Sequence, residues 1–296
     1  MLNEEKIMEK TIFITTILSA IMMILIIGFI ITESIPAIKE IGMINFILGS
    51  VWKPEANQYG ILPMIISTII LVVTTLIIAI PLSLGCSIFI TQYSNKYLNK
   101  IMIPALETLT GIPSVVYGFF GLIVISPIVR TYLGGEGFNF ITASIILSIM
   151  IMPTIITLSC DSLNAIGQSY KESSLALGAT KWQTIKNVLL PLASPGILTG
   201  IILAIGRIIG ESIAVIMIAG NVAQIPDSLT SPFRSLTSNI ALEMGYAIDL
   251  HYDALFLTGT VLLIVMLLLI MLTYRIKMKI EVQGVAWWIC INKQTI

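Results

Sequence analysis

"YKESSLALGATKWQTIKNVLLPLASPG" (Tyr170–Gly196) is the most informative segment of this 296-residue chain. It is polar, has helical composition and lies between two strongly apolar runs. The residues from Glu172 to Leu177 favour a short helix, and Gly178 suits the left-handed position that ends a helix. Thr180 can then cap a second helix through its hydroxyl group. The segment therefore predicts two short helices joined at Gly178.

The second helix carries its apolar side chains at helical spacing, on Trp182, Ile185 and Val188. Proline has no backbone N–H and clashes with the preceding turn. We therefore expect Pro191 and Pro195 to stop this helix and to restart the chain as a membrane span. By periodicity alone, the segment could equally be an amphipathic loop that lies on a membrane surface.

The composition around this segment indicates an integral membrane protein. Hydrophobic residues make up 56% of the chain, charged residues make up 11%, and the mean hydropathy is +0.99. A soluble domain usually carries about 25% charged residues. The formal net charge is zero, so the overall charge does not indicate a nucleic-acid partner.

Six segments are long and apolar enough to cross about 30 Å of hydrocarbon. The first follows a charged start and has no small-residue cleavage site behind it, so we read it as a retained helix and not as a signal peptide. The predicted fold is an all-α integral membrane protein with six transmembrane helices, at roughly 11–31, 61–90, 101–129, 138–160, 196–220 and 254–275.

The distribution of Lys and Arg predicts the orientation, because cytoplasmic segments carry an excess of these residues. With the N-terminus inside, the predicted outer loops hold Lys39, Lys53, Arg130 and Arg234, and Arg207 lies within a span. All other cations are inside, so both termini should be cytoplasmic. The inner cations are Lys6, Lys10, Lys96, Lys100, Lys171, Lys181, Lys186, Arg275, Lys277, Lys279 and Lys293.

The inner segment resembles the EAA loop of ABC importer permeases, whose pattern is E-A-A-x3-G-x9-I-x-L-P. Here the matching positions are Glu172, Ser173, Ser174, Gly178, Val188, Leu190 and Pro191. Every spacing is kept, while two alanines are replaced by serine and isoleucine by valine. The resemblance implies that these residues couple the chain to an ATPase subunit, as a helix seated in a groove.

Two further stretches resemble the phosphate-specific permeases, which occur as a PstC and PstA pair. They are "LETLTGIPSVVYGFFGLIVISP" (Leu106–Pro127) and "LPLASPGILTGIILAIGRIIGESIAVIMIAGN" (Leu190–Asn221), and the ending "GESIAVIMIAGN" is similar to the PstC type. The resemblance covers about residues 60–275. It implies the type I ABC importer permease (MetI-like) fold, with a permease domain at 61–275 and a coupling loop at 168–191. Residues 1–60 then form the N-terminal segment, first span and outer loop, and 276–296 form a cytoplasmic tail.

The resemblance also implies the partners. We expect a homologous PstA-like permease, two PstB-like ATPase subunits and an extracytoplasmic PstS-like phosphate-binding protein. The sequence contains no G-x-x-x-x-G-K-[ST] phosphate loop. We therefore expect no enzymatic activity and no bound cofactor or metal on this chain, with ATP and Mg²⁺ used by the partner ATPase. This chain itself should be a multi-pass protein of the cell membrane.

Arg207 and Glu211 are two charges within an apolar run, where each costs about 2.5–3.5 kcal/mol on insertion scales. If 196–220 is one helix, they lie about 40° apart on one face. On that reading Gly200, Ala204 and Ala214 share the charged face, and Ile202, Ile205, Ile209 and Ile216 face lipid. The pair could simply neutralise itself between two permease subunits. Alternatively, Arg207 meets the transported anion through its guanidinium fork and Glu211 orients it, which are the roles that the resemblance implies.

Secondary candidates lie in the third span. Glu107 could serve structure or transport, and "GIPS" (Gly111, Ile112, Pro113, Ser114) interrupts the helix, as at plain kinks or at substrate sites. The alternatives for the whole chain are a PstA-type permease, a permease for sulfate or molybdate, a stand-alone channel or secondary carrier, and a scaffold or sensor. We expect His251 to be a loop residue and not a ligand. Trp287 and Trp288, in the tail, could lie at the inner membrane interface.

Overall fold

The computed structural model describes the backbone of residues 2–293 and the side chains of residues 8–278. Trp287 and Trp288 therefore lie outside the residues whose side chains are described. The helices are α1 (Leu2–Ile41), α2 (Met43–Leu48), α3 (Leu62–Ile88), α4 (Lys96–Gly111), α5 (Ser114–Phe120), α6 (Ser126–Leu133), α7 (Phe140–Asn164), α8 (Gln168–Ala176), α9 (Lys181–Thr184), α10 (Leu190–Gly210), α11 (Ile213–Ile218), α12 (Leu236–Glu243) and α13 (Asp249–Lys293).

Short irregular elements complete the fold. Strands β1 (Trp52–Lys53) and β2 (Gln58–Tyr59) pair antiparallel, with Trp52 opposite Tyr59, around a 3₁₀ turn at Pro54–Ala56. Three π-helical turns lie at Phe89–Tyr93, Gly121–Ile125 and Ile185–Leu189. Each of them continues directly from an α-helix; the turns at 121–125 and 185–189 lead on into α6 and α10, whereas the turn at 89–93 ends at Ser94, which is extended.

The six predicted spans are confirmed; the first runs to Ile41, beyond its predicted end at residue 31, and the third and fifth have shifted limits. Among the described residues, six helical stretches are long and apolar enough to cross a membrane: Met8–Ile41, Leu62–Tyr93, Ser114–Leu133, Phe140–Asn164, Lys181–Gly210 and Asp249–Met278. The third begins at Ser114, because α4 is a separate helix before it. The fifth begins at Lys181 and ends at Gly210, earlier than predicted at both ends.

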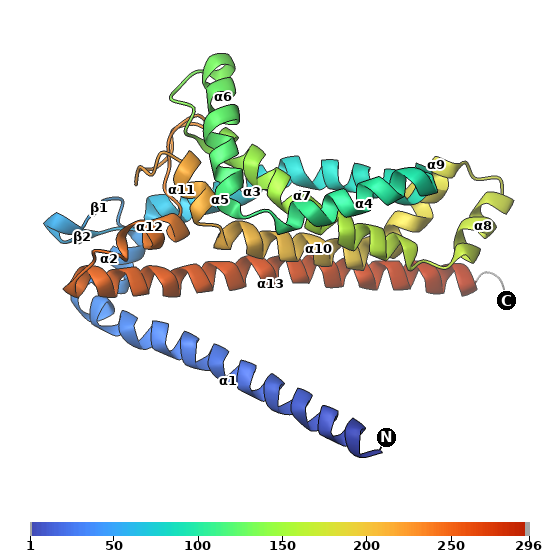
Figure 1. Cartoon of the computed structure of the whole chain (residues 1–296), viewed down its shortest axis with the longest axis horizontal. Helices are drawn as coiled ribbons and strands as arrows, with labels where there is room; N and C mark the ends of the chain where they lie inside the picture. The colour runs from blue at the N-terminus through green and yellow to red at the C-terminus, as the bar shows by residue number, and fades with distance from the viewer. Residues whose placement is uncertain (1, 294–296) are drawn as a thin grey trace.

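The elements are arranged along one long axis (Figure 1). The hairpin β1–β2, α2 and α12 gather at one end, which we call the hairpin end. Helices α8 and α9 lie at the opposite end, which we call the loop end, and α13 runs toward it along the length of the molecule. The segments predicted to share the inner side of the membrane therefore lie toward the same end of the molecule.

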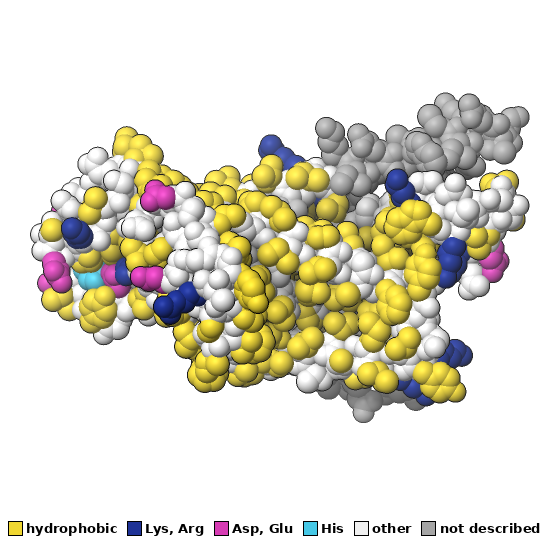
Figure 2. Space-filling view, turned by 90° about the horizontal axis from the view of Figure 1, so that it is seen from above, with side chains coloured by type: hydrophobic (Ala, Val, Ile, Leu, Met, Phe, Trp, Pro, Cys, Tyr) yellow, Lys and Arg dark blue, Asp and Glu magenta, His cyan; other side chains and the backbone are white. Residues whose placement is uncertain are grey.

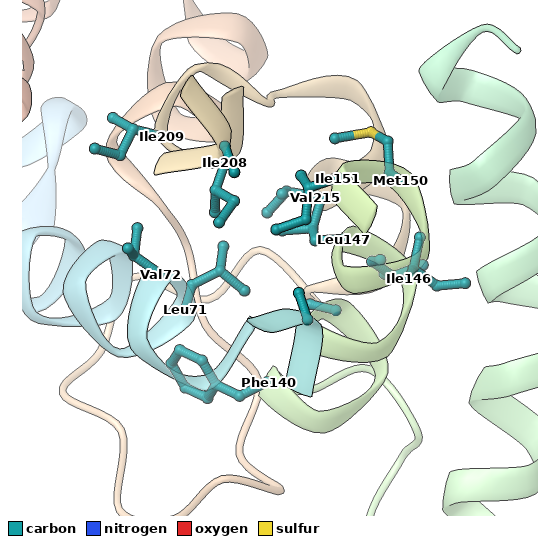
Figure 3. Packing of buried hydrophobic residues seen from close by; sticks show 14 of the residues in the cluster. Leu71, Val72, Phe140, Ile146, Leu147, Met150, Ile151, Ile208, Ile209 and Val215 are labelled. Atoms are coloured by element: carbon teal, nitrogen blue, oxygen red, sulfur yellow. The ribbon is translucent and has the colours of Figure 1, made fainter. Parts of the chain in front are cut away.

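The core is built around α7, which packs against α3 and α10. Figure 3 shows Leu71 of α3 and Ile208 of α10 turned toward the α7 side chains, with Val215 of α11 beside them and Val72 and Ile209 at the far edge of the same cluster. One prediction is wrong here. Ile205 and Ile209 were expected to face lipid, yet they are 5% and 1% exposed.

A broad apolar surface surrounds this core. Figure 2 shows hydrophobic side chains over the middle of the molecule, with most of the charged side chains near its two ends. Helix α1 is exposed along most of its length and meets α13 near the hairpin end, where Phe29 and Phe256 pack edge to face at 5.6 Å between ring centroids. Such exposure suits a helix in lipid, because the hydrocarbon chains are as apolar as its side chains.

Candidate functional site

Arg207 and Glu211 do not lie on one continuous helix, which corrects the helical-wheel prediction. Helix α10 ends at Gly210, Glu211 has extended backbone (φ −74°, ψ 121°), and α11 begins at Ile213. No ion pair joins Arg207 to Glu211 within the described part of the chain. The sequence does contain a stop and start signal, Gly210 followed by Ser212, which the assumption of a single helix passed over.

Glu211 is held by three hydrogen bonds. Its backbone N–H donates to Ile208 O at 3.2 Å, and its carboxylate Oε1 accepts from the Ala214 N–H at 3.0 Å. Its carbonyl oxygen accepts from the Thr237 hydroxyl at 3.1 Å. The carboxylate therefore caps the first turn of α11 and does not neutralise the arginine.

Arg207 lies half-buried in the last turn of α10. Within the described residues it makes no ion pair and no side-chain hydrogen bond. The phenol of Tyr117, on α5, lies within electrostatic range of its charge. Gly200, earlier on the same helix, packs closely on α7: a Cβ there would lie 3.3 Å from Leu158 Cβ. Arg207 thus presents a guanidinium group without an internal counter-charge.

A second helix break lies beside the first. Helix α4 ends at Gly111, Ile112 and Pro113 are extended, and α5 begins at Ser114. The Tyr117 hydroxyl donates to Leu109 O across this break at 2.8 Å. "GIPS" is therefore a true interruption and not a plain kink.

Helices α5 and α11 pack directly against each other. A Cβ on Gly118 would lie 3.0 Å from Ala214 Cα, so the two backbones touch only because residue 118 is glycine. Glu107 is exposed on α4, one turn before this break, and has no ion-pair partner among the described residues. The structure thus brings Arg207, Glu211 and the "GIPS" break into one region.

Helices α8 and α9 form a two-helix unit at the loop end, which holds four of the predicted coupling residues, Glu172, Ser173, Ser174 and Gly178. Gly178 has φ +84° between α8 and α9, as its left-handed assignment predicted. Thr180 accepts from the Gln183 N–H and Gln183 returns a bond to the Thr180 N–H, which makes a full capping box. The hydroxyls of Ser174 and Thr184 lie 3.0 Å apart and join the two helices.

This unit contacts the π-helical turn Phe89–Tyr93 that follows α3, and it presents an apolar surface. Lys171 Nζ donates to Gln92 Oε1 at 2.9 Å, and Lys181 Nζ lies 4.1 Å from the ring centroid of Tyr93. Leu177 is 90% exposed at the tip and Trp182 is 55% exposed. Glu172 and Ser173 are exposed on α8, so these side chains are free to meet another protein.

Pro191 and Pro195 do not stop the helix, which corrects that prediction. The chain runs from α9 through the π-helical turn Ile185–Leu189 into α10, with Val188 in that turn and Leu190 and Pro191 opening α10. A π-turn shifts the hydrogen-bond register just before Pro191, where the missing N–H is tolerated in the first turn. Helix α9 and the Arg207 helix, α10, are therefore one connected rod.

A polar cluster, which we call the Glu243 cluster, lies at the hairpin end. Glu243 is 5% exposed and accepts from Arg234 Nη1 at 2.6 Å, from Trp52 Nε1 at 2.8 Å and pairs with His251 Nε2 at 2.8 Å. The expectation of a loop histidine is wrong, since His251 lies in the first turn of α13. Burial is the main cause that raises the pKa of Tyr59, and the negative charges of Glu40 and Glu243 raise it further. Burial is also the main cause that raises the pKa of Tyr246, followed by the charge of Glu243.

The chain is similar in sequence to known membrane transport proteins. Residues 79–277 match the family described as "Binding-protein-dependent transport system inner membrane component". A "Probable ABC transporter permease protein YqgH" of Bacillus subtilis is 37% identical over 79% of this chain and 78% of its own. A "Phosphate transport system permease protein PstC" of Haemophilus influenzae is 32% identical over 90% of this chain and 89% of its own.

Solved structures share the fold at low identity. A chain of a bacterial alginate ABC transporter has a TM-score of 0.61 at 17% identity, covering 89% of this chain and 94% of that one. A chain of the MetNI methionine ABC transporter, in an inward-facing conformation, has a TM-score of 0.55 at 18% identity, covering 78% and 99%. The predicted six-span, MetI-like permease fold is thereby confirmed. Since the family match extends over more than half of the chain, the protein belongs to the family of inner membrane components of binding-protein-dependent transport systems.

Proposed function

We propose that this chain is the PstC-type permease subunit of an ATP-driven phosphate importer. As a member of its family it is a multi-pass membrane permease subunit and not an enzyme. Support for phosphate comes from relatives named as phosphate permeases, which are 31–32% identical over about nine-tenths of the chain. In this proposal the chain forms half of the transmembrane path for inorganic phosphate.

The observation that carries the proposal is the position of Arg207. A guanidinium at membrane depth, half-buried and without an internal counter-charge, suits an anion that passes and leaves. Its planar fork matches two phosphate oxygens at once. The two adjacent helix breaks supply irregular backbone, which membrane proteins tolerate where it lines a cavity. Glu211 shapes the break by capping α11.

We assign the binding of the partners to the loop end and the hairpin end of the molecule. Two ATPase subunits supply the energy, and one of them seats on α8 and α9 of this chain, where Leu177 and Trp182 are exposed. A phosphate-binding protein delivers the anion at the hairpin end, and a homologous PstA-like permease completes the path. Both termini are then cytoplasmic. Because α9 and α10 are one rod, ATP-driven motion of the ATPases reaches Arg207 directly.

Uptake of labelled phosphate by the reconstituted four-component transporter tests the role of Arg207. Arg207→Lys keeps the charge and loses the fork, so we expect uptake to fall at least tenfold, which corresponds to about 1.4 kcal/mol. Arg130→Lys is the matched control, since Arg130 is exposed in α6, and it should transport normally. Uptake at the wild-type rate by Arg207→Lys would refute a bidentate role.

The same assay separates the alternatives. Competition by sulfate or molybdate at equal concentration would favour another oxyanion. Uptake that persists without the ATPase subunits would favour a channel or secondary carrier. Normal uptake by Arg207→Gln, together with altered assembly, would favour a scaffold or sensor.

A further inference from the structure

Helix α12 connects the Glu211 break to the hairpin end. At its N-terminal end, the Thr237 hydroxyl donates to the Glu211 carbonyl at 3.1 Å, across 26 residues of sequence. One residue earlier, the Leu236 N–H donates to the Thr68 hydroxyl of α3 at 3.1 Å. The N-terminal end of α12 is therefore fixed against both the break and the core.

The C-terminal end of α12 is fixed just as firmly. Glu243 is its last residue and the centre of the Glu243 cluster, which joins β1 through Trp52 and α13 through His251. Arg234 also donates to Asn239 Oδ1 at 3.0 Å and to Asn221 O at 2.9 Å. Since α12 has eight residues, it is about 12 Å long. A helix this short moves as a rigid body, so its two ends move together.

The Glu243 cluster borders a cavity at the hairpin end. A cavity of about 1040 Å³ lies between the β1–β2 hairpin and the start of α13, and it is lined in part by Trp52, Tyr59, Glu243, Tyr246 and His251. A protein that docks at the hairpin end would touch the side chains that hold Glu243. Displacement of those side chains would move α12.

We propose that Thr237 is a positioning residue: its hydroxyl holds the Glu211 break in place. The Glu243 cluster, at the other end of α12, fixes this helix to the hairpin-end surface. A change at that surface can then pass along α12 to the break next to Arg207. The functional meaning of this link rests on the proposed transport role, while the link itself is a property of the chain.

Thiol labelling at the break tests the link. Cys86, Cys160 and Cys290 are replaced by Ser, and Ser212→Cys supplies a probe beside Glu211, since the Ser212 side chain caps nothing. In the reconstituted transporter, Thr237→Val and Thr237→Ala should each raise the rate of labelling by a membrane-impermeant maleimide about fivefold, as expected for the loss of one hydrogen bond. Thr237→Ser keeps the hydroxyl and should label at the parent rate.

Thr260→Val is the matched control, because the Thr260 hydroxyl bonds only to Phe256 O within α13. An unchanged rate in Thr237→Val and Thr237→Ala, or an equal rise in Thr260→Val, would overturn the proposal. Either Thr237 variant suffices if the other does not assemble.

The anchor is tested by a double-mutant cycle. Glu243→Gln should raise the labelling rate in the same direction, and adding Thr237→Val should raise it little further, because both changes act through α12. Independent, multiplying effects would overturn the anchoring role. Labelling does not depend on the transported anion, so a wrong assignment of phosphate would abolish the uptake result and leave this one intact.

Discussion

Gly118→Ala tests whether the contact between α5 and α11 holds the candidate site together. The added Cβ would lie 3.0 Å from Ala214 Cα and 2.8 Å from Met217 Sδ, whereas ordinary contacts begin at 3.4 Å. The flexible Met217 side chain can move away. The Ala214 backbone cannot, so α11 must shift by at least 0.4 Å, the difference between 3.4 and 3.0 Å.

The magnitude follows from two opposing effects. Overpacking of this kind costs about 1–3 kcal/mol, while replacing a helical glycine by alanine gains at most about 0.5–1 kcal/mol. The cost wins, and we expect a net loss of about 1 kcal/mol in the free energy of unfolding. Uptake should also fall, because the shift moves the Ala214 N–H away from the Glu211 carboxylate, which it now meets at 3.0 Å.

Denaturant unfolding of the purified transporter and phosphate uptake measure the two effects. Gly85→Ala is the control: Gly85 is exposed in α3 and a Cβ there would meet nothing within 4 Å. It should be at least as stable as the parent protein. If Gly118→Ala matched the parent in stability and uptake, or if Gly85→Ala lost as much, the close contact would not matter to the site.

Three further changes test other parts of the structure. Gly178→Ala places a side chain at φ +84°, which costs about 1–2 kcal/mol. Transport-coupled ATP hydrolysis should fall in Gly178→Ala and fall less in Gly178→Asn. Equal activity of the parent, Gly178→Ala and Gly178→Asn would contradict the backbone strain. Glu211→Gln keeps an acceptor for the Ala214 N–H, so uptake should survive in Glu211→Gln and fall in Glu211→Ala; a loss in both would mean that the charge itself is required. The raised pKa of Tyr59 adds stability that is present below about pH 10, the ordinary tyrosine pKa, and is lost as the pH rises through the folded-state pKa. The absorbance difference between the parent and Tyr59→Phe should therefore show ionisation only above about pH 10. Ionisation at or below about pH 10 would contradict the burial of Tyr59.

Local signals predicted the loop end well. Gly178 and Thr180 act within a few residues of their own positions, through a left-handed backbone and a hydroxyl cap, so the sequence alone identifies them. The six spans were equally accessible, because the length and hydropathy of a spanning helix are dictated by the bilayer. The proline prediction failed because a π-turn can absorb the defect before Pro191, and no residue type marks such a turn.

The centre of the molecule depends on contacts that local patterns do not carry. The helical wheel placed Ile205 and Ile209 toward lipid, but both side chains are buried in the core, and hydropathy does not distinguish lipid from core. Thr237 was missed because it lies in a segment read as a loop. Ser235, which caps α12, is the one signal that could have revealed the helix.

The break after Gly210 explains how an arginine can serve at membrane depth. On a continuous helix, Glu211 would lie one turn from Arg207 and compete with any passing anion for the guanidinium. The extended backbone at Glu211 instead commits one carboxylate oxygen to the Ala214 N–H, and Thr237 holds the carbonyl. An arginine left without that partner carries an insertion cost of about 2.5–3.5 kcal/mol. An anion that binds Arg207 offsets this cost only while it is present. In the proposed transport role, an anion at Arg207 therefore has no internal carboxylate to displace.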